Sequence, residues 1–282
     1  MSQAVRLQEG LEPFPGYRLT GFLGQGGWGE VWKATRPEGP PLALKFLPCD
    51  SQLAAAQEIR GLQSIRQLQH ANLIRIDQIW CYAGYIVIAM ELAEGSLLDL
   101  LGVYTSEFGT GIIPEHLCHF LGQAAAALDF LNTRQHNLNG QRVAVRHCDV
   151  KPSNVLIVGG IIKLTDFSLA TQTTSPMWYH RKFGTIDYAA PEVFHGWLSD
   201  RTDQYALGVT YCHLRSGKLP FDDTPSRFRE DFVRAAPDLS VLTAPERAII
   251  LRALAPVPQD RWPSCTELIT RLAQSLAPAV PV

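Results

Sequence analysis

The stretch Arg146-His147-Cys148-Asp149-Val150-Lys151-Pro152-Ser153-Asn154 places an acid, an amine and a carboxamide close together in the chain. Two runs of β-type residues flank it, Val143–Val145 before and Val155–Val158 after. A second acid, Asp166, follows soon after the second run. A D-x-K-x-x-N pattern alone is weak evidence. A polar loop between buried strands, with another carboxylate close by, is typical of a functional site.

Composition narrows the class of protein. The chain has 282 residues, 46% of them hydrophobic, which suits one large domain or two lobes. A net charge of −2 gives no reason to expect a partner nucleic acid. Six scattered cysteines without a C-x-x-C pair indicate reduced thiols rather than a zinc cage. No leader pattern or membrane-length apolar run is present, so we expect a cytoplasmic protein without membrane insertion.

A glycine-rich turn precedes the loop, between two predicted strands. Tyr17–Leu23 reads as the first strand, Gly24, Gly26 and Gly29 follow it, and Val31–Ala34 is the second. Each glycine costs about 0.5–1 kcal/mol in regular structure, which suggests close approach of the backbone to something, unless this is an ordinary flexible hairpin. A dinucleotide-binding loop would open a helix instead of a strand. The G-x-G-x-x-G-x-V pattern resembles the loop that covers ATP phosphates in protein kinases.

The next two segments extend the resemblance. Pro41–Leu47 is an apolar strand except for Lys45, which could simply snorkel from an edge strand. After a glycine loop, it resembles the kinase lysine that holds the α- and β-phosphates of ATP. Gln52–Gln69 is helical in composition, with Glu58 on the same face as Leu62. The resemblance makes Glu58 the salt-bridge partner of Lys45; the alternative is a solvated helix charge.

A buried strand, Tyr85–Met90, leads into a stretch that the resemblance makes the hinge between two lobes. In protein kinases the hinge backbone faces adenine, and apolar side chains cover the ring. The resemblance therefore implies an ATP-binding set of residues: Leu23, Gly24, Gly26, Gly29, Val31, Ala43, Lys45, Glu91, Ala93 and Leu156.

Helices are predicted over Leu97–Leu101 and Glu115–Leu131, with a polar loop over Gly102–Pro114 and a polar surface connection over Asn132–Gln141. The longer helix has an apolar stripe that we expect to face the core, formed by Leu117, Phe120, Leu121, Ala124, Leu128 and Leu131. The resemblance runs from Tyr17 to Leu272 and implies an α+β, two-lobed, protein-kinase-like fold. We expect a flexible arm over 1–15, a mostly antiparallel β N-lobe with one main helix over 16–90, a hinge over 91–96, a mainly helical C-lobe over 97–275 and a tail over 276–282.

The opening stretch resembles the kinase catalytic loop H-R-D-x-K-x-x-N. The resemblance implies that Asp149 accepts the proton of the substrate hydroxyl and that Lys151 neutralises phosphate charge. It also implies that Asn154 and Asp166 bind Mg²⁺, with Mn²⁺ as an alternative, because hard oxygen ligands and phosphates suit these ions. ATP is the implied phosphoryl donor.

Later motifs point to serine and threonine as acceptors. Gly184–Glu192 resembles the kinase segment G-T-x-x-Y-x-A-P-E, whose threonine contacts the catalytic loop in Ser/Thr kinases. Lys151 is also typical of that subtype. The resemblance further implies that Asp203 braces the catalytic-loop backbone and that Arg261 pairs with Glu192.

Two positions depart from the family pattern. Cys148 replaces the arginine of H-R-D, which pairs with a phosphate on the activation loop in many kinases. We therefore expect an activity that does not depend strongly on loop phosphorylation. Ser168 replaces the glycine of D-F-G, so we expect backbone strain there, retained metal binding by Asp166 and restricted flipping of the loop.

The chain is most similar to bacterial Hanks-type Ser/Thr protein kinases, in a variant without the H-R-D arginine. The predicted function is transfer of the γ-phosphoryl group of ATP to serine and threonine hydroxyls of protein substrates, including the chain itself through self-association. Two alternatives stay open. One is a pseudokinase, an ATP-binding scaffold that acts through protein partners, and the other is a small-molecule kinase of similar fold.

Overall fold

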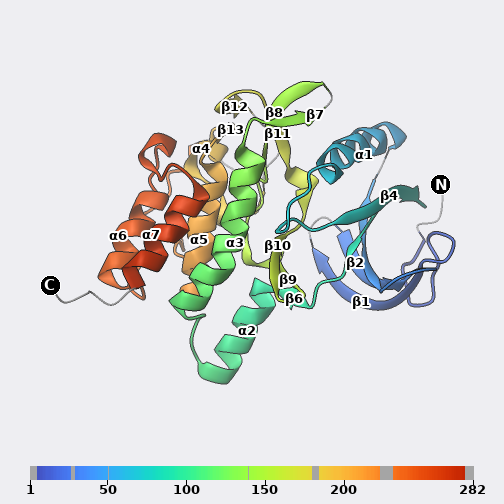
Figure 1. Cartoon of the computed structure of the whole chain (residues 1–282), viewed down its shortest axis with the longest axis horizontal. Coiled ribbons are helices and arrows are strands. Elements are labelled where there is room, and N and C mark those ends of the chain that lie inside the picture. The colour runs from blue at the N-terminus through green and yellow to red at the C-terminus, as the bar shows by residue number, and fades with distance from the viewer. Residues whose placement is uncertain are drawn as a thin grey trace. The chain divides into compact units, whose positions relative to one another are not determined.

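The computed structural model describes residues 5–26, 29–49, 51–138, 140–179, 184–222 and 231–276 (Figure 1). The chain divides into two compact units. The first unit contains Met1–Gln69 and Leu73–Glu94, and the second contains His70–Asn72 and Gly95–Val282. The second unit therefore resumes at Gly95, inside the stretch 91–96 that the sequence suggested as a hinge.

The first unit is built on a five-stranded antiparallel sheet in the order β1-β2-β3-β5-β4. The strands are β1 (Arg18–Gly26), β2 (Gly29–Thr35), β3 (Leu42–Pro48), β4 (Ile76–Tyr82) and β5 (Tyr85–Glu91). Alternate residues of β5 enter two separate apolar clusters, Val87 and Ala89 on one face and Ile86 and Ile88 on the other. The second cluster includes Leu62 of helix α1 (Gln52–Arg66), so α1 covers that face.

Residues 5–15, for which the sequence suggested a flexible arm, lie draped against the opposite face of the sheet. Leu7 is buried in the apolar cluster that contains Val87. The amide of Gly10 donates to the carbonyl of Leu19 at 2.8 Å, and the amide of Leu19 donates to the carbonyl of Leu11 at 2.9 Å. These backbone bonds, together with the burial of Leu7, fix the path of the segment.

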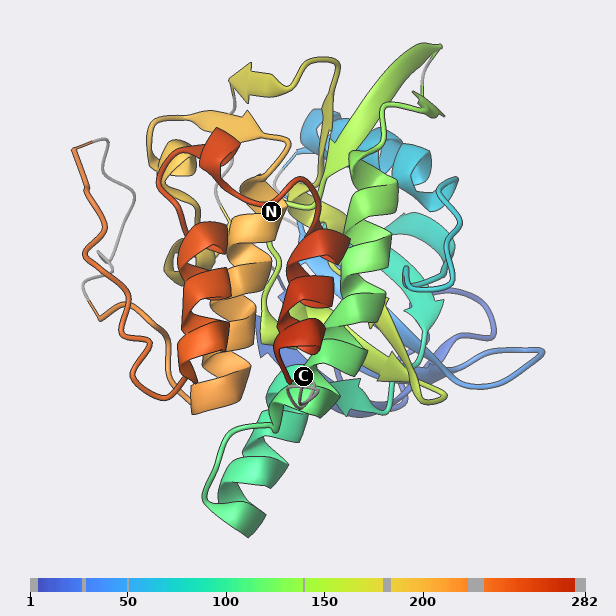
Figure 2. The same cartoon turned by 60° about the vertical axis from the view of Figure 1, so that its left-hand side comes forward.

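The second unit is mainly helical. Its helices are α2 (Leu97–Phe108), α3 (Pro114–Asn132), α4 (Pro191–Phe194), α5 (Thr202–Ser216), α6 (Ala244–Ala253) and α7 (Cys265–Leu276). Figure 2 shows α6, α5, α7 and α3 side by side. The apolar stripe predicted on α3 is its buried face, although Phe120 is only half-buried. An α+β chain with an antiparallel sheet and one main helix followed by a helical region is therefore confirmed.

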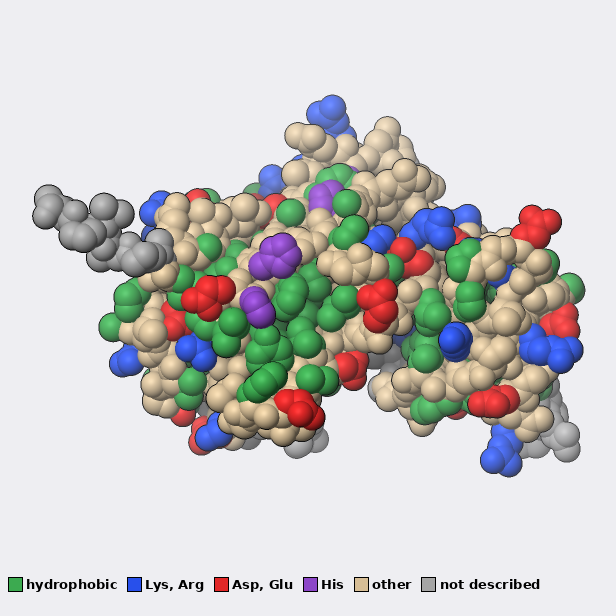
Figure 3. All heavy atoms as spheres, turned by 60° about the horizontal axis from the view of Figure 1, so that its bottom comes forward, with side chains coloured by type: hydrophobic (Ala, Val, Ile, Leu, Met, Phe, Trp, Pro, Cys, Tyr) green, Lys and Arg blue, Asp and Glu red, His purple; other side chains and the backbone are tan. Residues whose placement is uncertain are grey.

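Helix α2 corrects the prediction that a loop begins at Gly102. The helix continues to Phe108, because Ser96 and Asp99 form a capping box at its start and Gly109 ends it in the left-handed conformation. Glycine lowers helix propensity but does not forbid a helix that is held at both ends. The added turns expose Val103 and Phe108. Helix α2 lies at the bottom of Figure 1, and Figure 3, which brings that side forward, shows apolar side chains gathered on this face.

The polar connection predicted over Asn132–Gln141 also contains regular structure. Strand β7 (His136–Leu138) forms a hairpin with β8 (Gln141–Arg146), and β8 pairs on its other edge with β11 (Thr171–Thr173). His136 and Leu138 are buried, so this segment is not merely a surface excursion.

The remaining strands are short. They are β6 (Gly95–Ser96), β9 (Val155–Val158), β10 (Ile161–Leu164), β12 (Met177–Tyr179) and β13 (Trp197–Ser199), in the antiparallel pairs β6–β9, β9–β10 and β12–β13. A long-range cap closes the unit: both carboxylate oxygens of Asp129 accept backbone N–H groups at the start of α7, from Cys265 and Thr266, at 2.8 Å each. No helix in the described part of the chain is long and apolar enough to cross a lipid bilayer.

Candidate active site

The loop quoted at the outset joins two strands of the second unit. It leaves β8 at Arg146, passes through a single 3-10 turn at Pro152–Asn154 and enters β9 at Val155. The predicted polar loop between two strands is therefore present, although only Val155 of β9 is fully buried. Its conformation depends on contacts from α5, β10 and the segment around Thr185.

Asp203, at the start of the buried helix α5, holds the backbone of the loop. Its Oδ2 accepts the amide of His147 and its Oδ1 accepts the amide of Cys148, both at 2.9 Å. Cys148 has a φ of +66°, a left-handed conformation that non-glycine residues rarely adopt. The two bonds to one buried carboxylate offset the cost of that conformation. The predicted bracing by Asp203 is confirmed.

His147 connects the loop to the strand that precedes Asp166. Its imidazole is fully buried, and its Nδ1 accepts the amide of Asp149 at 3.3 Å. The other ring nitrogen, Nε2, must therefore carry the proton, which it donates to the carbonyl of Thr165 at 2.9 Å. The ring also packs on Phe167, with 5.2 Å between ring centroids. One side chain thus fixes the loop relative to Thr165.

Asp149, which is 4% exposed, is the centre of a hydrogen-bond network. Its Oδ1 accepts both the amide and the hydroxyl of Thr185, at 2.9 and 2.8 Å. Its Oδ2 accepts the amide nitrogen of Asn154 and lies 2.9 Å from the Lys151 ammonium. Lys151 in turn donates to the Thr185 hydroxyl at 2.6 Å. The structure therefore brings together the predicted base, the predicted phosphate-binding lysine and the threonine from a distant segment.

These contacts decide the charge of Asp149. Burial would raise the pKa of this carboxyl group, but the Lys151 charge and the hydrogen bonds from Lys151 and Thr185 outweigh burial and lower the pKa below its ordinary value of 3.8. Asp149 is therefore ionised at neutral pH, as an acceptor of hydrogen bonds must be.

Gly184 permits this network. A Cβ at this position would lie only 2.2 Å from the carbonyl oxygen of Cys148 and 3.1 Å from Oδ1 of Asp149. No side chain fits there without moving the backbone of the loop. The glycine thus allows Thr185 to approach Asp149 closely.

Asn154 and Asp166 flank the same end of the β9–β10 hairpin. Val155 pairs with Leu164, and the amide of Thr165 donates to the carbonyl of Asn154 at 3.0 Å. The amide nitrogen of Asn154 makes both of that side chain's bonds to Asp149, which leaves its oxygen for a cation. An amide oxygen beside a carboxylate is a hard donor set, and these residues therefore fit Mg²⁺.

Ser168 differs from its prediction. It lies in a 3-10 turn, Phe167–Leu169, and is not among the residues with positive φ; the left-handed residue is Asp166, with φ +64°. The expected strain at the serine is therefore wrong. Instead, its hydroxyl donates to Oδ1 of Asp166 at 2.8 Å, a bond that glycine could not make.

The other predicted site residues, except Leu156 on β9, belong to the first unit. Lys45 is buried in β3, Val31 of β2 is its cross-strand partner, and Glu58 is half-buried in α1. The Lys45–Glu58 salt bridge stays a prediction. Ala43 lies on β3, Leu23, Gly24 and Gly26 on β1, Glu91 at the end of β5, and Ala93 just after it.

The glycines of the predicted phosphate loop fall into two kinds. Gly29 has a φ of +137°, and a Cβ there would lie 1.9 Å from the carbonyl oxygen of Phe46 on β3. The packing of the sheet therefore requires this glycine. Gly24 and Gly26 have open space around the position of a Cβ, so no described residue of the protein requires them to be glycine. Space of this kind is what a bound phosphate chain would use.

The predicted pair between Glu192 and Arg261 is confirmed. The guanidinium donates to both carboxylate oxygens, at 2.7 and 2.9 Å, and both side chains are buried. Arg261 also donates to the carbonyls of Ala255, Arg201 and Pro256, and Glu192 also accepts the hydroxyls of Ser199 and Thr202. This buried pair is therefore fully hydrogen-bonded.

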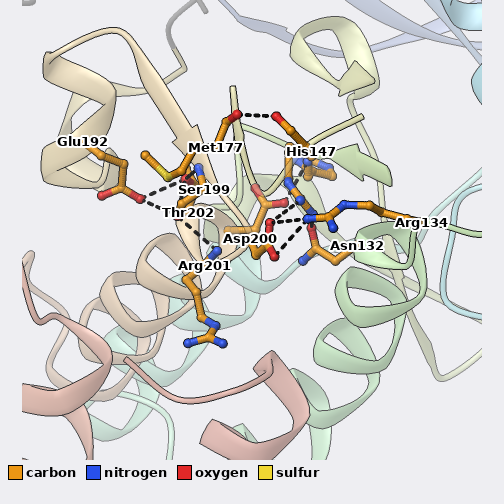
Figure 4. Close-up of polar contacts among 12 residues, drawn as sticks. Asn132, Arg134, His147, Met177, Glu192, Ser199, Asp200, Arg201 and Thr202 are labelled. Carbon is orange, nitrogen blue, oxygen red and sulfur yellow. Dashed lines mark hydrogen bonds and ion pairs between the residues drawn. The ribbon is translucent and has the colours of Figure 1, made fainter. Parts of the chain in front are cut away.

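Sequence reasoning missed a second ion pair near the loop. Arg146 is 1% exposed and donates to Asp200 at 2.7 Å. Asn132 and Arg134 complete the group, and Figure 4 shows them facing Asp200. No motif marks these positions. The only signal in the sequence was an arginine placed just before His147.

Comparison with known proteins agrees with the geometry. The chain is 29% identical to the serine/threonine-protein kinase PknF of Mycobacterium tuberculosis, over 94% of this chain and 57% of that protein. It is also 29% identical to the PTI1-like tyrosine-protein kinase 1 of Arabidopsis thaliana, over 84% of this chain and 67% of that protein. The chain thus spans little more than half the length of PknF. Residues 17–275 match the model of the protein kinase domain, and the chain belongs to the protein kinase family.

Proposed function

We propose that this chain is an active serine/threonine protein kinase that uses ATP and Mg²⁺. The observation that carries the proposal is the network in which Asp149 is bound by Lys151, Asn154 and Thr185. Phosphoryl transfer needs positioning and charge stabilisation more than covalent chemistry, and these side chains supply both. The similarity to PknF supports a bacterial Ser/Thr kinase of the Hanks type.

Asp149 orients the acceptor hydroxyl and takes its proton as the new oxygen–phosphorus bond forms, while the bond from the γ-phosphorus to the β,γ-bridging oxygen breaks and ADP leaves. A carboxylate offers about four lone-pair sites, and Thr185, Asn154 and Lys151 use them all. A substrate hydroxyl must therefore displace one donor. Lys151 is the mobile one, because it has a flexible stem and the other donors are a backbone amide and short side chains. A γ-phosphate draws its ammonium away and so opens Oδ2 to the substrate.

Asn154 and Asp166 would hold the metal ion, whose charge offsets that of the ATP phosphates. Ser168 orients Asp166 through the bond to its Oδ1. In the first unit, Lys45 would bind the phosphates and pair with Glu58. The acceptor class rests on Thr185 and Lys151. Because one relative is named a tyrosine-protein kinase, tyrosine acceptors belong in the test.

The test is transfer of labelled phosphate from ATP to peptides that carry serine, threonine or tyrosine, with Mg²⁺ or Mn²⁺. We expect transfer to serine and threonine, and a loss of roughly 10²–10⁴-fold in Asp149→Asn. Equal transfer by wild type and Asp149→Asn would refute the proposal. A stabilisation by ATP in thermal melts without any transfer would instead favour the pseudokinase scaffold.

Self-phosphorylation through transient association of two copies is part of the proposal. A fixed rate constant for self-labelling across protein concentrations would argue against transfer between copies. A cytoplasmic location stays a prediction.

A further inference from the structure

An ion-pair cluster lies at the start of the catalytic loop, on the side where the loop lacks its family arginine. The cluster consists of Arg146 at the end of β8, Asp200 just after β13, and Asn132 and Arg134 near the end of α3. Its acid, Asp200, is bound by two guanidinium groups, and Asp203 adds a second negative charge close to Arg146. All four residues belong to the second unit.

The carboxylate of Asp200 lies between two arginine side chains. It lies 2.7 Å from the Arg146 guanidinium and 3.3 Å from that of Arg134, while Asn132 accepts a second bond from Arg146. Arg146 is 1% exposed, and the Asp200 side chain is 43% exposed. Figure 4 shows Asp200 beside Arg134 and Asn132, whereas Arg201 points away. Two arginines around one partly exposed anion form the kind of site that binds a phosphate group.

The same cluster connects two strands of the segment between Asp166 and Glu192, which we call the activation segment because it matches the activation loop of protein kinases. Thr171 of β11 pairs with Arg146 of β8, which fixes the start of the segment. Further along, β12 pairs with β13, and Asp200 directly follows β13. The Arg146–Asp200 pair therefore ties the β12–β13 ribbon to the strand that leads into the catalytic loop.

Cys148 cannot make this connection. Its thiol is uncharged, and burial raises its pKa. The thiol donates to the carbonyl of Arg146 at 3.5 Å and so offers no positive charge to Asp200. The cation nearest along the chain is Arg146, whose burial requires an acidic partner.

We infer that Asp200 acts as a built-in substitute for an activation-loop phosphate, and that the Arg146–Asp200 latch keeps the β12–β13 ribbon in place without phosphorylation. Arg146 and Asp200 are positioning residues, since neither touches Asp149. The catalytic consequence rests on the proposed kinase function; the structural consequence does not.

The test uses Asp200→Asn, which keeps the shape and removes the charge. We expect amide hydrogen exchange in β12 to become about tenfold faster, with α3 and α7 unchanged. We also expect kcat/KM for a protein substrate to fall about tenfold, with the KM for ATP within about twofold of wild type. Asp200→Glu keeps the charge, so its exchange rate in β12 and its kcat/KM should both be close to those of wild type. Glu267→Gln, which removes an exposed ion pair to Arg271 on α7, is the matched control and should change neither.

Unchanged exchange in β12 of Asp200→Asn would overturn the inference, as would loss of wild-type activity after phosphatase treatment. If wild type transfers no phosphate at all, the proposed kinase function is wrong. Hydrogen exchange in β12 then still shows whether the Arg146–Asp200 pair holds the β12–β13 ribbon in place. If Asp200→Asn does not fold, Arg134→Gln removes the outer guanidinium; a smaller increase in exchange in β12 supports the latch, and no increase contradicts it.

Discussion

Replacing Gly184 by alanine tests the geometry around Asp149 most directly. The added Cβ would lie 2.2 Å from the carbonyl oxygen of Cys148, whereas an ordinary contact with carbon is about 3.5 Å. That carbonyl cannot retreat freely, because Asp203 holds the amide of the same residue. The backbone at Gly184 and Thr185 must therefore move by about 1 Å or more to reach ordinary contact distances.

The movement acts on two hydrogen bonds. Thr185 donates its amide and its hydroxyl to Oδ1 of Asp149 at 2.9 and 2.8 Å. A hydrogen bond to a charged group contributes about 1.5–3 kcal/mol of stabilisation. A shift of about 1 Å breaks one or both of the Thr185 bonds to Asp149. The loss of transition-state stabilisation is therefore about 2–4 kcal/mol, or roughly 30- to 1,000-fold in kcat/KM.

The assay is steady-state phosphoryl transfer to a serine peptide, with a thermal melt to show that the variant is folded. Gly102→Ala is the matched control, since Gly102 lies in helix α2 with open space around its Cβ position. It should keep the wild-type kcat/KM and gain about 0.5–1 kcal/mol of stability from the better helix former. A folded Gly184→Ala variant with kcat/KM within about twofold of wild type would refute the reasoning.

Three further predictions concern stability, pH and metal. Glu192→Gln should lower the free energy of unfolding by about 3–5 kcal/mol in urea denaturation, since it leaves the buried Arg261 without its anion; an effect below about 1 kcal/mol would contradict this. The lowered pKa of Asp149 means that its ionised form stabilises the fold above its ordinary pKa of 3.8 and that this contribution disappears as pH falls through the lower, folded pKa. The difference in unfolding free energy between wild type and Asp149→Asn should therefore be flat from about pH 7 to 5 and shrink in more acidic buffer; a change within that plateau would be evidence against it. Ser168→Gly removes the hydrogen bond to Asp166 and should raise the Mg²⁺ concentration needed for half-maximal activity severalfold. An unchanged Mg²⁺ concentration would show that Ser168 does not orient the Asp166 carboxylate.

The elements of this fold that repeat a periodic pattern were predictable from the sequence. The apolar run around Lys45 has the length of a buried strand, and the stripe on α3 has the period of a helix; a strand and a helix formed there as expected. The prediction failed at Gly102, where local propensity argued for a loop but a capping box and a left-handed C-cap hold the helix. It also failed at β7, because a strand of three residues is too short to show a period; the run Val143–Val145, in contrast, became part of β8.

The sequence predicted those parts of the site whose side chains come from one short motif. Asp149, Lys151 and Asn154 are close in sequence, so their meeting required only one loop. The bond from Thr185 became predictable only through the family resemblance. Asp200 carried no signal, because its partner Arg146 lies 54 residues earlier and neither position belongs to a motif. Pairings between single side chains at such separations depend on the fold and leave no local pattern.

The cap of α7 by Asp129 has a consequence for how the protein is made. The carboxylate reaches its two amide partners across separations of 136 and 137 residues. During synthesis, Asp129 on α3 therefore leaves the ribosome long before Cys265 and Thr266, whose amides it caps. Glu192 likewise leaves the ribosome well before its partner Arg261. Non-local contacts of this kind delay folding, because the loop between them must close first. We expect nascent chains arrested before Arg261 to be digested by protease across the second unit, and chains released with α7 complete to be resistant.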